Sequence, residues 1–247
     1  MPEDGDDGLY GNISPGQQTP TGHAGAAHDT ASRAADAYTP HDSTAYAQGS
    51  NSQETERREA MEYWGQMINP DKSASTKLDA LLRGIANYIR NTFSPTDSPD
   101  LMPEQLAAFY RHIGANFDVF FIDMTPKDIG CTYTAMYCMH SLQPPPPSSS
   151  SPADYYAAPT VPALKTIGFV KWQMIMLLLA PAEHVAFLQT ALRICDIRHP
   201  VDNSPFPKIL PEELFPRTPD PKIKDWYDTV HTALQAKIQG LPSHEEL

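Results

Sequence analysis

The chain has 247 residues, of which 18 are Lys or Arg and 30 are Asp or Glu, so its formal net charge at pH 7 is -12. A protein this acidic is poorly suited to hold a nucleic-acid duplex by neutralising phosphates, so we expect no nucleic-acid partner. The chain is 40% hydrophobic and contains 25 prolines. This mixture is typical of a folded core interrupted by Pro- and Ser-rich segments.

The start of the chain and its cysteines indicate a compartment. Residues 1–8 read MPEDGDDG, whereas a signal peptide needs basic residues followed by an apolar stretch. The longest aliphatic run, residues 174–180, is far shorter than the ~20 residues of a membrane-spanning helix. Three cysteines do not make the even, dense set of a secreted disulfide framework. We therefore expect a protein of the cytoplasm or nucleus that makes no contact with a membrane.

Composition divides the chain into segments. Residues 1–52 form the predicted disordered acidic tail, because the first fifty residues hold seven acidic side chains, one Arg and almost no large aliphatics. A helical domain is predicted at 53–241, interrupted by a Pro/Ser-rich loop at 143–160 that contains four consecutive prolines and four consecutive serines. Residues 242–247 are expected to form a flexible C-terminus.

Apolar spacing predicts helices in the first part of the domain. A helix is expected over 54–68, stopped by Asn69 and Pro70, and a second from Ser75 to Phe93 with apolar residues every three or four positions. Pro103 and Gly114 mark the ends of a third. A fourth is expected from the Thr125–Pro126 cap to His140. The apolar run 117–122 (FDVFFI) is predicted to be a buried strand or an extended plug.

The second part also has helical spacing. A helix from Thr166 is expected to present one apolar face, and another begins at Pro181 after a tight corner. The proline-rich stretch 200–221 is predicted to be an irregular arm, and the last helix runs from about Asp220 to Gly240. The anchors expected for the arm are Phe206, Ile209, Leu214 and Phe215. The predicted fold is all-α, with six or seven helices, a long Pro-rich arm and one short extended segment.

Metal sites are not expected. Cys138 and His140 together with Cys195 and His199 could supply two thiolates and two imidazoles, but their spacing differs from that of compact zinc sites. Residues 69–80 resemble a calcium-binding helix–loop–helix in outline, yet alanines stand at the positions that need Gly and a bidentate Glu. We interpret that stretch as a turn followed by a helix capped by Ser73 or Ser75.

The usual catalytic motifs are missing from the sequence. There is no G-x-S-x-G turn, and seven of the 13 glycines precede residue 51, so the domain has no Gly-rich phosphate loop. Cys131 or Cys138 could pair with His140, but on one helix residues 138 and 140 would point about 200° apart. We predict no catalytic residue, no metal ligand and no cofactor. The Trp and Met residues are assigned to the core, with an apolar-ligand pocket as the alternative.

Regulation is predicted in the segments expected to be disordered. Ser14, Thr19, Thr39 and Ser151 each precede a proline, so we expect a proline-directed kinase to phosphorylate them. The alternative is that Ser and Pro are simply frequent in disordered chains. The Pro/Ser-rich loop is also predicted to present Tyr155 and Tyr156 to a partner.

Several strings of residues resemble a fungal, ascomycete-type family of helical domains of unknown function. They are WGQMINPDKSASTKLDALLRGIANYI (64–89), MPEQLAAFY (102–110), CMH (138–140), GFVKW (168–172), and FPK (206–208) through LFP (214–216). The resemblance covers about residues 55–240 without the Pro/Ser insert. The chain departs from the family pattern at Ala74, where Gly is frequent, and at Met102, where Thr commonly caps the helix. The resemblance implies a fungal source and a domain boundary, and no activity.

Three functions remain open. The first is a non-enzymatic protein-interaction domain, an adaptor or scaffold, in a fungal intracellular protein with an unknown partner. The second is a ligand-binding or hydrolytic protein whose site is assembled from residues distant in sequence, which a deep polar pocket would favour. The third is an exported effector. An exposed apolar surface would favour the first.

Overall fold

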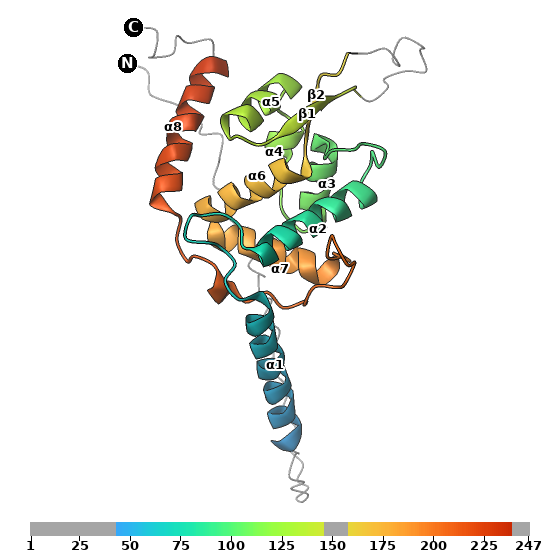
Figure 1. The fold of residues 1–247 in the computed structure, drawn as a ribbon, viewed down its shortest axis with the longest axis vertical. Coiled ribbons are helices and arrows are strands. Elements are labelled where there is room, and N and C mark those ends of the chain that lie inside the picture. The colour runs from blue at the N-terminus through green and yellow to red at the C-terminus, as the bar shows by residue number, and fades with distance from the viewer. Residues whose placement is uncertain (1–42, 146–157, 239–247) are drawn as a thin grey trace, which may run out of the picture. The chain divides into compact units, whose positions relative to one another are not determined.

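The computed structural model describes residues 43–145 and 158–238. The chain divides into two units, Met1–Asp42 and Ser43–Leu247, and the second contains all described residues. That unit consists of α1 (Ser43–Trp64), α2 (Thr76–Thr92), α3 (Pro103–His112), α4 (Asp118–Phe121), α5 (Pro126–Ala135), β1 (His140–Gln143), β2 (Val161–Leu164), α6 (Thr166–Leu179), α7 (Pro181–Ile194) and α8 (Pro221–Ile238), with one 3-10 turn at Glu212–Leu214 (Figure 1). The predicted, largely helical fold is confirmed. The all-α prediction is wrong in the strict sense, because β1 and β2 form an antiparallel pair, and the described residues contain eight α-helices rather than six or seven.

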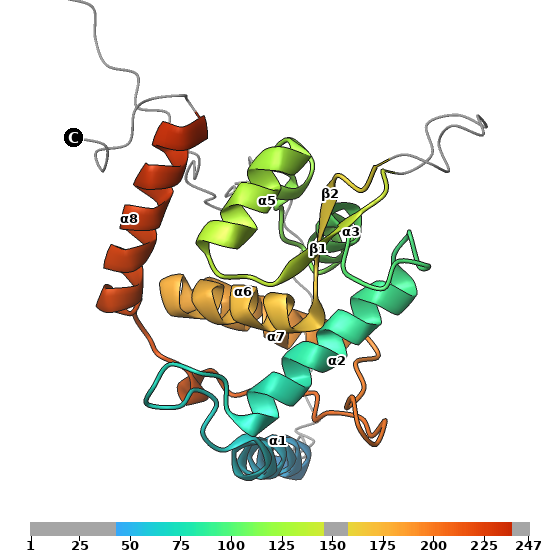
Figure 2. The ribbon, with the colours of Figure 1, turned by 45° about the horizontal axis from the view of Figure 1, so that its top comes forward.

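The core is built around α6. Figure 2 shows α6 in the middle of the unit, with α5 on one side and α2 and α7 on the other. The sequence predicts one apolar face containing Phe169 and Trp172, and both side chains are buried. Met174 and Leu177, which point in other directions, are buried as well. A helix that is apolar on every side is typical of an interior helix surrounded by other elements.

The starts of two helices follow their predicted caps. The Ser75 hydroxyl accepts a hydrogen bond from the Leu78 backbone N–H at 3.3 Å, so the turn-and-cap interpretation of residues 69–80 is confirmed. α1 differs from the prediction at both ends. It begins at Ser43, inside the segment 1–52 that we expected to be disordered, and it ends at Trp64 rather than Ile68, because Gly65 follows with φ 55°.

α5 ends five residues earlier than predicted. The Tyr137 N–H donates to the Thr134 carbonyl at 3.0 Å and the Cys138 N–H to the Tyr133 carbonyl at 2.8 Å, which is the hydrogen-bond pattern of a Schellman helix end. Tyr137 itself has φ 56°, a left-handed conformation that usually belongs to Gly. α3 ends with the same pattern, and Gly114 stands there at φ 83°. The sequence therefore carried no visible stop signal after Ala135.

The run 117–122 is neither a strand nor an extended plug. It forms the single helical turn α4, in which Phe121 is buried against Tyr110 with ring centroids 5.8 Å apart. The extended segments lie elsewhere, in β1 and β2, which flank the Pro/Ser-rich insert. Both strands are only four residues long and carry no alternating apolar pattern, so periodicity could not identify them.

Two of the sequence strings that resemble the family, CMH (138–140) and GFVKW (168–172), lie against each other where the β1–β2 hairpin joins α6. The Met139 carbonyl accepts a hydrogen bond from the Lys165 N–H at 3.0 Å. It also lies so close to Gly168 that a Cβ on this residue would be 2.0 Å from the carbonyl oxygen. Only Gly permits this approach, so the position of the hairpin on α6 depends on residue 168.

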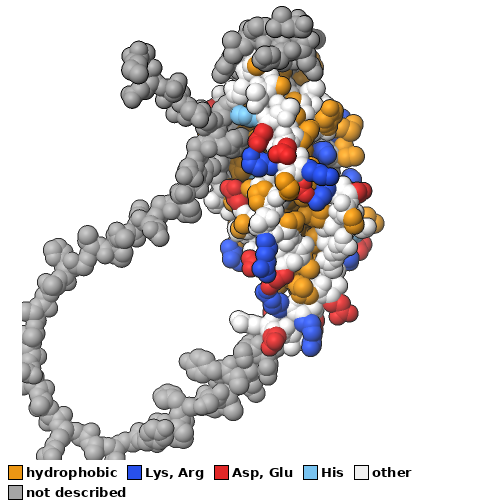
Figure 3. Space-filling view, turned by 90° about the vertical axis from the view of Figure 1, so that its left-hand side faces the viewer, with side chains coloured by type: hydrophobic (Ala, Val, Ile, Leu, Met, Phe, Trp, Pro, Cys, Tyr) orange, Lys and Arg blue, Asp and Glu red, His pale blue; other side chains and the backbone are white. Residues whose placement is uncertain are grey.

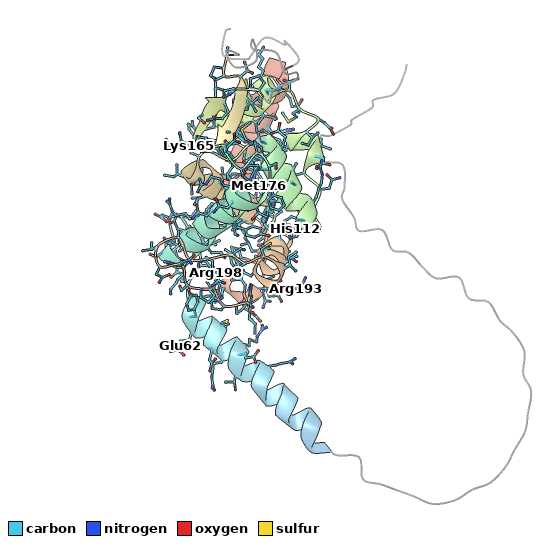
Figure 4. The ribbon with its side chains drawn as sticks, turned by 90° about the vertical axis from the view of Figure 1, so that its right-hand side faces the viewer. Glu62, His112, Lys165, Met176, Arg193 and Arg198 are labelled. Carbon is cyan, nitrogen blue, oxygen red and sulfur yellow. The ribbon has the colours of Figure 1, made fainter. Side chains whose placement is uncertain are left out.

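The Pro-rich arm covers the far end of the core, as predicted. Phe206 and Phe215 are buried, and Ile209 and Leu214 are partly buried against the core. The Phe206 ring stacks on Trp64 with a 5.7 Å centroid distance, and the Trp64 indole N–H donates to the Ile209 carbonyl at 2.8 Å. Figure 4 shows Arg198, in the loop before the arm, and Lys165, at the hairpin, toward opposite ends of the packed helices.

Candidate functional site

A surface groove of about 940 Å³ lies where α5, the β1–β2 hairpin and α8 meet, and we name it the α5–α8 groove. In Figure 2, α5 lies between α8 and the hairpin. The lining is mainly apolar and comes from three separate parts of the chain. It consists of Thr125, Pro126, Lys127, Gly130, Cys131, Thr134, Ala135, His140, Leu142, Pro159, Thr160, Val230, Ala233 and Leu234.

The face of α5 that lines the groove follows from its helical period. Lining residues recur at positions 127, 130–131 and 134–135, three to four residues apart. The N-cap Thr125 fixes the start of this helix, because its hydroxyl accepts a hydrogen bond from the Asp128 N–H at 3.2 Å and donates to the Asp128 carboxylate at 2.7 Å. Lys127 therefore lies in the first turn, at one end of the groove.

The hairpin supplies the second wall. His140 and Leu142 are two residues apart on β1, so their side chains share one face of the sheet, and both line the groove. Leu142 is 55% exposed although it is a large apolar residue. The same face of the hairpin packs on α5, since a Cβ on Gly130 would lie 3.8 Å from the Pro162 Cβ in ordinary contact. The groove thus continues from α5 onto β1.

The third wall, α8, is held by polar contacts at its first residues and by Trp226 and Tyr227, which pack against the core. The Asp220 carboxylate accepts hydrogen bonds from the Lys222 and Ile223 N–H groups at 3.1 and 3.2 Å, and it pairs with Lys72 at 2.5 Å. These contacts lower the pKa of Asp220, and the hydrogen bond from Lys72 makes the largest contribution. Among the α8 residues of known exposure, 221–236, none is buried. Figure 3 shows the side of the unit that carries α8, where hydrophobic and charged side chains are interspersed.

Cys131 and His140, the two residues that a Cys–His pair would require, both line the groove. The His140 Nδ1 lies 3.0 Å from the Cys138 carbonyl oxygen, which can only accept, so Nδ1 carries the hydrogen and Nε2 is the basic nitrogen of the neutral ring. However, the described residues show no hydrogen bond between the Cys131 thiol and His140. The groove therefore holds both groups without a formed nucleophile–base pair.

Cys138 is not part of such a pair. The expectation that Cys138 and His140 point apart on one helix is wrong, because they lie in the segment after α5 and in β1. Cys138 is buried, and burial raises the pKa of its thiol to about 12. It accordingly stays protonated and behaves as a core residue. Cys195 is also buried, which confirms its predicted place in the core.

Three further large pKa shifts belong to side chains of the interior, on α3, α5 and α7. Burial raises the pKa of Tyr110, whose hydroxyl is bonded to the Gln173 amide at 2.5 Å, and it raises the pKa of Tyr133. Burial lowers the pKa of His184 to about 4, and the Nδ1 of this residue has no hydrogen-bond partner. These three side chains are enclosed by the core and do not line the groove.

A polar cluster lies on the other face of β1. The Asp100 carboxylate accepts hydrogen bonds from the Ser141 hydroxyl at 2.6 Å and from the Lys165 ammonium at 3.3 Å. The Gln143 amide donates to the Ser141 hydroxyl at 2.8 Å. Together with the Leu101–Leu164 backbone bridge, the cluster holds the loop before α3 against the hairpin. We therefore assign this cluster a structural role, which is to fix the position of that loop.

Other predicted sites fall outside what the structure describes. Ser14, Thr19, Thr39 and Ser151, and the loop residues Tyr155 and Tyr156, all lie in 1–42 or 146–157. Within 43–145 and 158–238, no three His, Cys, Asp or Glu side chains are placed to hold a metal ion. Nor does that part of the chain contain a helix long and apolar enough to cross a membrane.

Sequence reasoning missed the groove because its walls are short and far apart in the chain. The one available signal was the series of small residues Gly130, Cys131, Thr134 and Ala135, which leave one side of α5 without bulky side chains. The larger residues of this helix, Ile129 and Tyr133, are buried on the opposite side. A small-residue face marks space beside a helix, and only the tertiary structure shows which elements border that space.

Comparison with known proteins gives a family but no activity. No curated protein and no solved structure matches the chain. A family model described as a domain of unknown function (DUF7514) matches residues 65–231, from the residue after α1 to the middle of α8. This match spans more than half of the chain and includes every part of the groove except Ala233 and Leu234. The chain belongs to this family of domains of unknown function.

Proposed function

We propose that this domain is a non-enzymatic interaction module that binds a peptide segment of a partner protein in the α5–α8 groove. The observation that carries the proposal is the α5–α8 groove itself. It is open, has a volume of about 940 Å³ and mainly apolar walls, and includes the half-exposed Leu142. Exposed apolar surface of this kind is typical of protein-binding sites.

The chemistry of the walls supports binding over catalysis. Among the described lining residues, one side chain, Lys127, is charged, and the thiol of Cys131 and the imidazole of His140 make no hydrogen bond with each other. A hydrolytic protein would need its nucleophile and base in contact, and a small-molecule site would enclose its ligand more fully. These two activities are therefore the second choice, and an exported effector is a third proposal that the groove equally permits.

The remaining expectations belong to the same proposal. A fungal source and a cytoplasmic or nuclear location are consistent with an adaptor of this kind. Phosphorylation of Ser14, Thr19, Thr39 or Ser151 would add a charge of about -1.5 to -2 at each site and would thereby regulate the binding of the partner. Tyr155 and Tyr156 are proposed as additional contacts with the partner.

The test compares two substitutions on neighbouring residues of α8. Ala233→Arg places a long side chain in the groove, whereas Thr232→Arg adds the same side chain to a neighbouring exposed residue that does not line it. Tagged full-length chains are purified from cells of the source organism, and each co-purified protein is then titrated as a purified component. We expect a partner that binds wild-type protein and Thr232→Arg but binds Ala233→Arg at least about tenfold more weakly. Equal binding by all three chains would refute the groove as the binding site.

A further inference from the structure

The hydrogen-bond pattern of the hairpin leaves one edge of β1 unpaired. The Lys165 N–H donates to Met139, which fixes the pair 139–165 as hydrogen-bonded, and every second pair must follow the same pattern. Ser141 and Gln143 therefore face β2, while the backbone groups of His140 and Leu142 face away from it. Pro162, which is paired with Leu142, fits this assignment because its missing N–H would point outward.

The hydrogen bonds on the outer side of β2 agree with this alternation of inward-facing and outward-facing residues. Leu164, which is paired with His140, uses both its N–H and its carbonyl to bond Leu101 on its outer side, at 2.8 Å each. Within the described residues, no backbone hydrogen bond involves the outward groups of His140 or Leu142. The edge is short, because the Cys138 N–H is bonded to Tyr133 at one end and Pro144 has no N–H at the other.

The sequence of β1 itself does little to protect this edge. Natural edge strands are protected by short length, charged residues or prolines; β1 reads HSLQ, without Lys, Arg, Asp, Glu or Pro, so its protection is limited to its four-residue length and to Pro144 after it. The approach to β1 also exposes large apolar side chains: Tyr137 is 75% and Met139 is 56% exposed, in addition to Leu142. A short edge without charged residues and with exposed apolar neighbours is suited to pairing with another short strand.

The edge and the groove are parts of one surface. A strand added beside β1 would place every second side chain on the same face as His140 and Leu142, that is, in the groove over α5. The charged side chain that the groove presents is the cation Lys127, in the first turn of α5, where the helix dipole also favours a negative group. Charge complementarity thus selects an acidic residue in the added strand.

We propose that the partner segment binds by β-strand addition: an extended peptide with alternating apolar residues and an acidic residue pairs with β1 through His140 and Leu142, and directs its apolar side chains into the groove. The inference rests on the proposed function, and it specifies the conformation and chemistry of the bound segment. The two outward-facing residues offer four backbone hydrogen bonds, so recognition depends on register as well as on apolar contact.

The experiment uses the full chain and a random peptide library displayed on phage, from which the best binder is synthesised as the probe. Leu142→Ala and Leu142→Pro both remove the Leu side chain, but only the proline removes the outward N–H, and neither breaks a hydrogen bond to β2. We expect Leu142→Pro to bind the probe about tenfold more weakly than Leu142→Ala, because a peptide carbonyl loses its donor. Amide hydrogen exchange at His140 and Leu142 should slow when the probe binds.

Other results would overturn the inference in distinguishable ways. Equal affinity of the two Leu142 variants, or a selected consensus with apolar residues three and four apart, would refute strand addition while leaving a peptide groove in place. Absence of any enriched peptide, or binding that Ala233→Arg leaves unchanged, would refute the proposed function as well. A dimer of the free chain that Leu142→Pro dissociates would replace the partner peptide by a second copy.

Discussion

Stability should fall as the pH is lowered from 7 toward 4 because of His184. This side chain is 3% exposed, with rings of Phe117 and Phe187 at centroid distances of 6.0 and 5.3 Å, and burial lowers its pKa from 6.5 to about 4. Between these two values the unfolded chain binds a proton that the folded chain does not, so the free energy of unfolding rises with pH across this window and is lost as pH falls. The shift corresponds to about 3 kcal/mol in total, of which about 2 kcal/mol should be lost by pH 5.

The assay is urea denaturation at pH 7.5, 6.5, 5.5 and 5.0 for wild-type protein, His184→Leu and His112→Gln. The leucine variant keeps an apolar side chain in the site and removes the titration, so its unfolding free energy should change about 2 kcal/mol less between pH 7.5 and 5.0 than that of wild type. His112 is exposed and serves as the control, which should follow wild type. If His184→Leu loses as much stability as wild type over this interval, the buried neutral imidazole is not the cause.

Four further substitutions, of which Gly130→Ala is a control, test local geometry by thermal or urea unfolding. Gly168→Ala should destabilise by about 3 kcal/mol or more, because its Cβ would lie 2.0 Å from the Met139 carbonyl oxygen. Gly130→Ala should instead stabilise by about 0.5–1 kcal/mol, because its Cβ would make only an ordinary contact with Pro162 at 3.8 Å; equal effects would disprove the close approach. Tyr137→Gly should stabilise by about 1 kcal/mol by relieving the left-handed conformation, and a loss of stability would indicate an unrecognised contact of the Tyr ring. Lys208→Met should cost about 1 kcal/mol, since the ammonium donates to two carbonyls at the end of α7 at 2.7 and 3.0 Å; an unchanged midpoint would argue against this cap.

The sequence predicted helices best where a regular spacing of apolar residues begins directly after a residue that favours a helix start. α2 starts after Ser75 and ends at Thr92, one residue before the expected Phe93, and α7 starts at Pro181 as expected. α5 was predicted too long because a Tyr stands at the left-handed position where α3 has Gly. A helix end formed by hydrogen bonding alone, against the preference of its residue, leaves no trace in composition.

The strands and the groove could not be predicted for a different reason. β1 and β2 are separated by the Pro/Ser-rich insert, and each is stabilised by contacts with distant residues, such as the Leu101 bridge to Leu164 and the Met139 contact with Gly168. Pairing energy of this kind depends on neighbours across the sheet rather than on local propensity. The site residues His140 and Leu142 belong to such a strand, so their alignment with α5 became visible only in three dimensions.

The family match and the folded unit have different N-terminal boundaries, and the contacts of Trp64 explain why this matters. The match begins at residue 65, yet Trp64 is 1% exposed, stacks on Phe206 and donates to Ile209 in the Pro-rich arm. Ala60, one turn earlier, is also buried, whereas residues 53–59 are exposed. The last turn of α1 is therefore part of the core that holds the arm. A segment that begins at residue 65 would therefore lack Trp64, so the Phe206 ring would lose its stacking partner and the Ile209 carbonyl would lose its hydrogen-bond donor. This loss would destabilise the fold that also forms the groove.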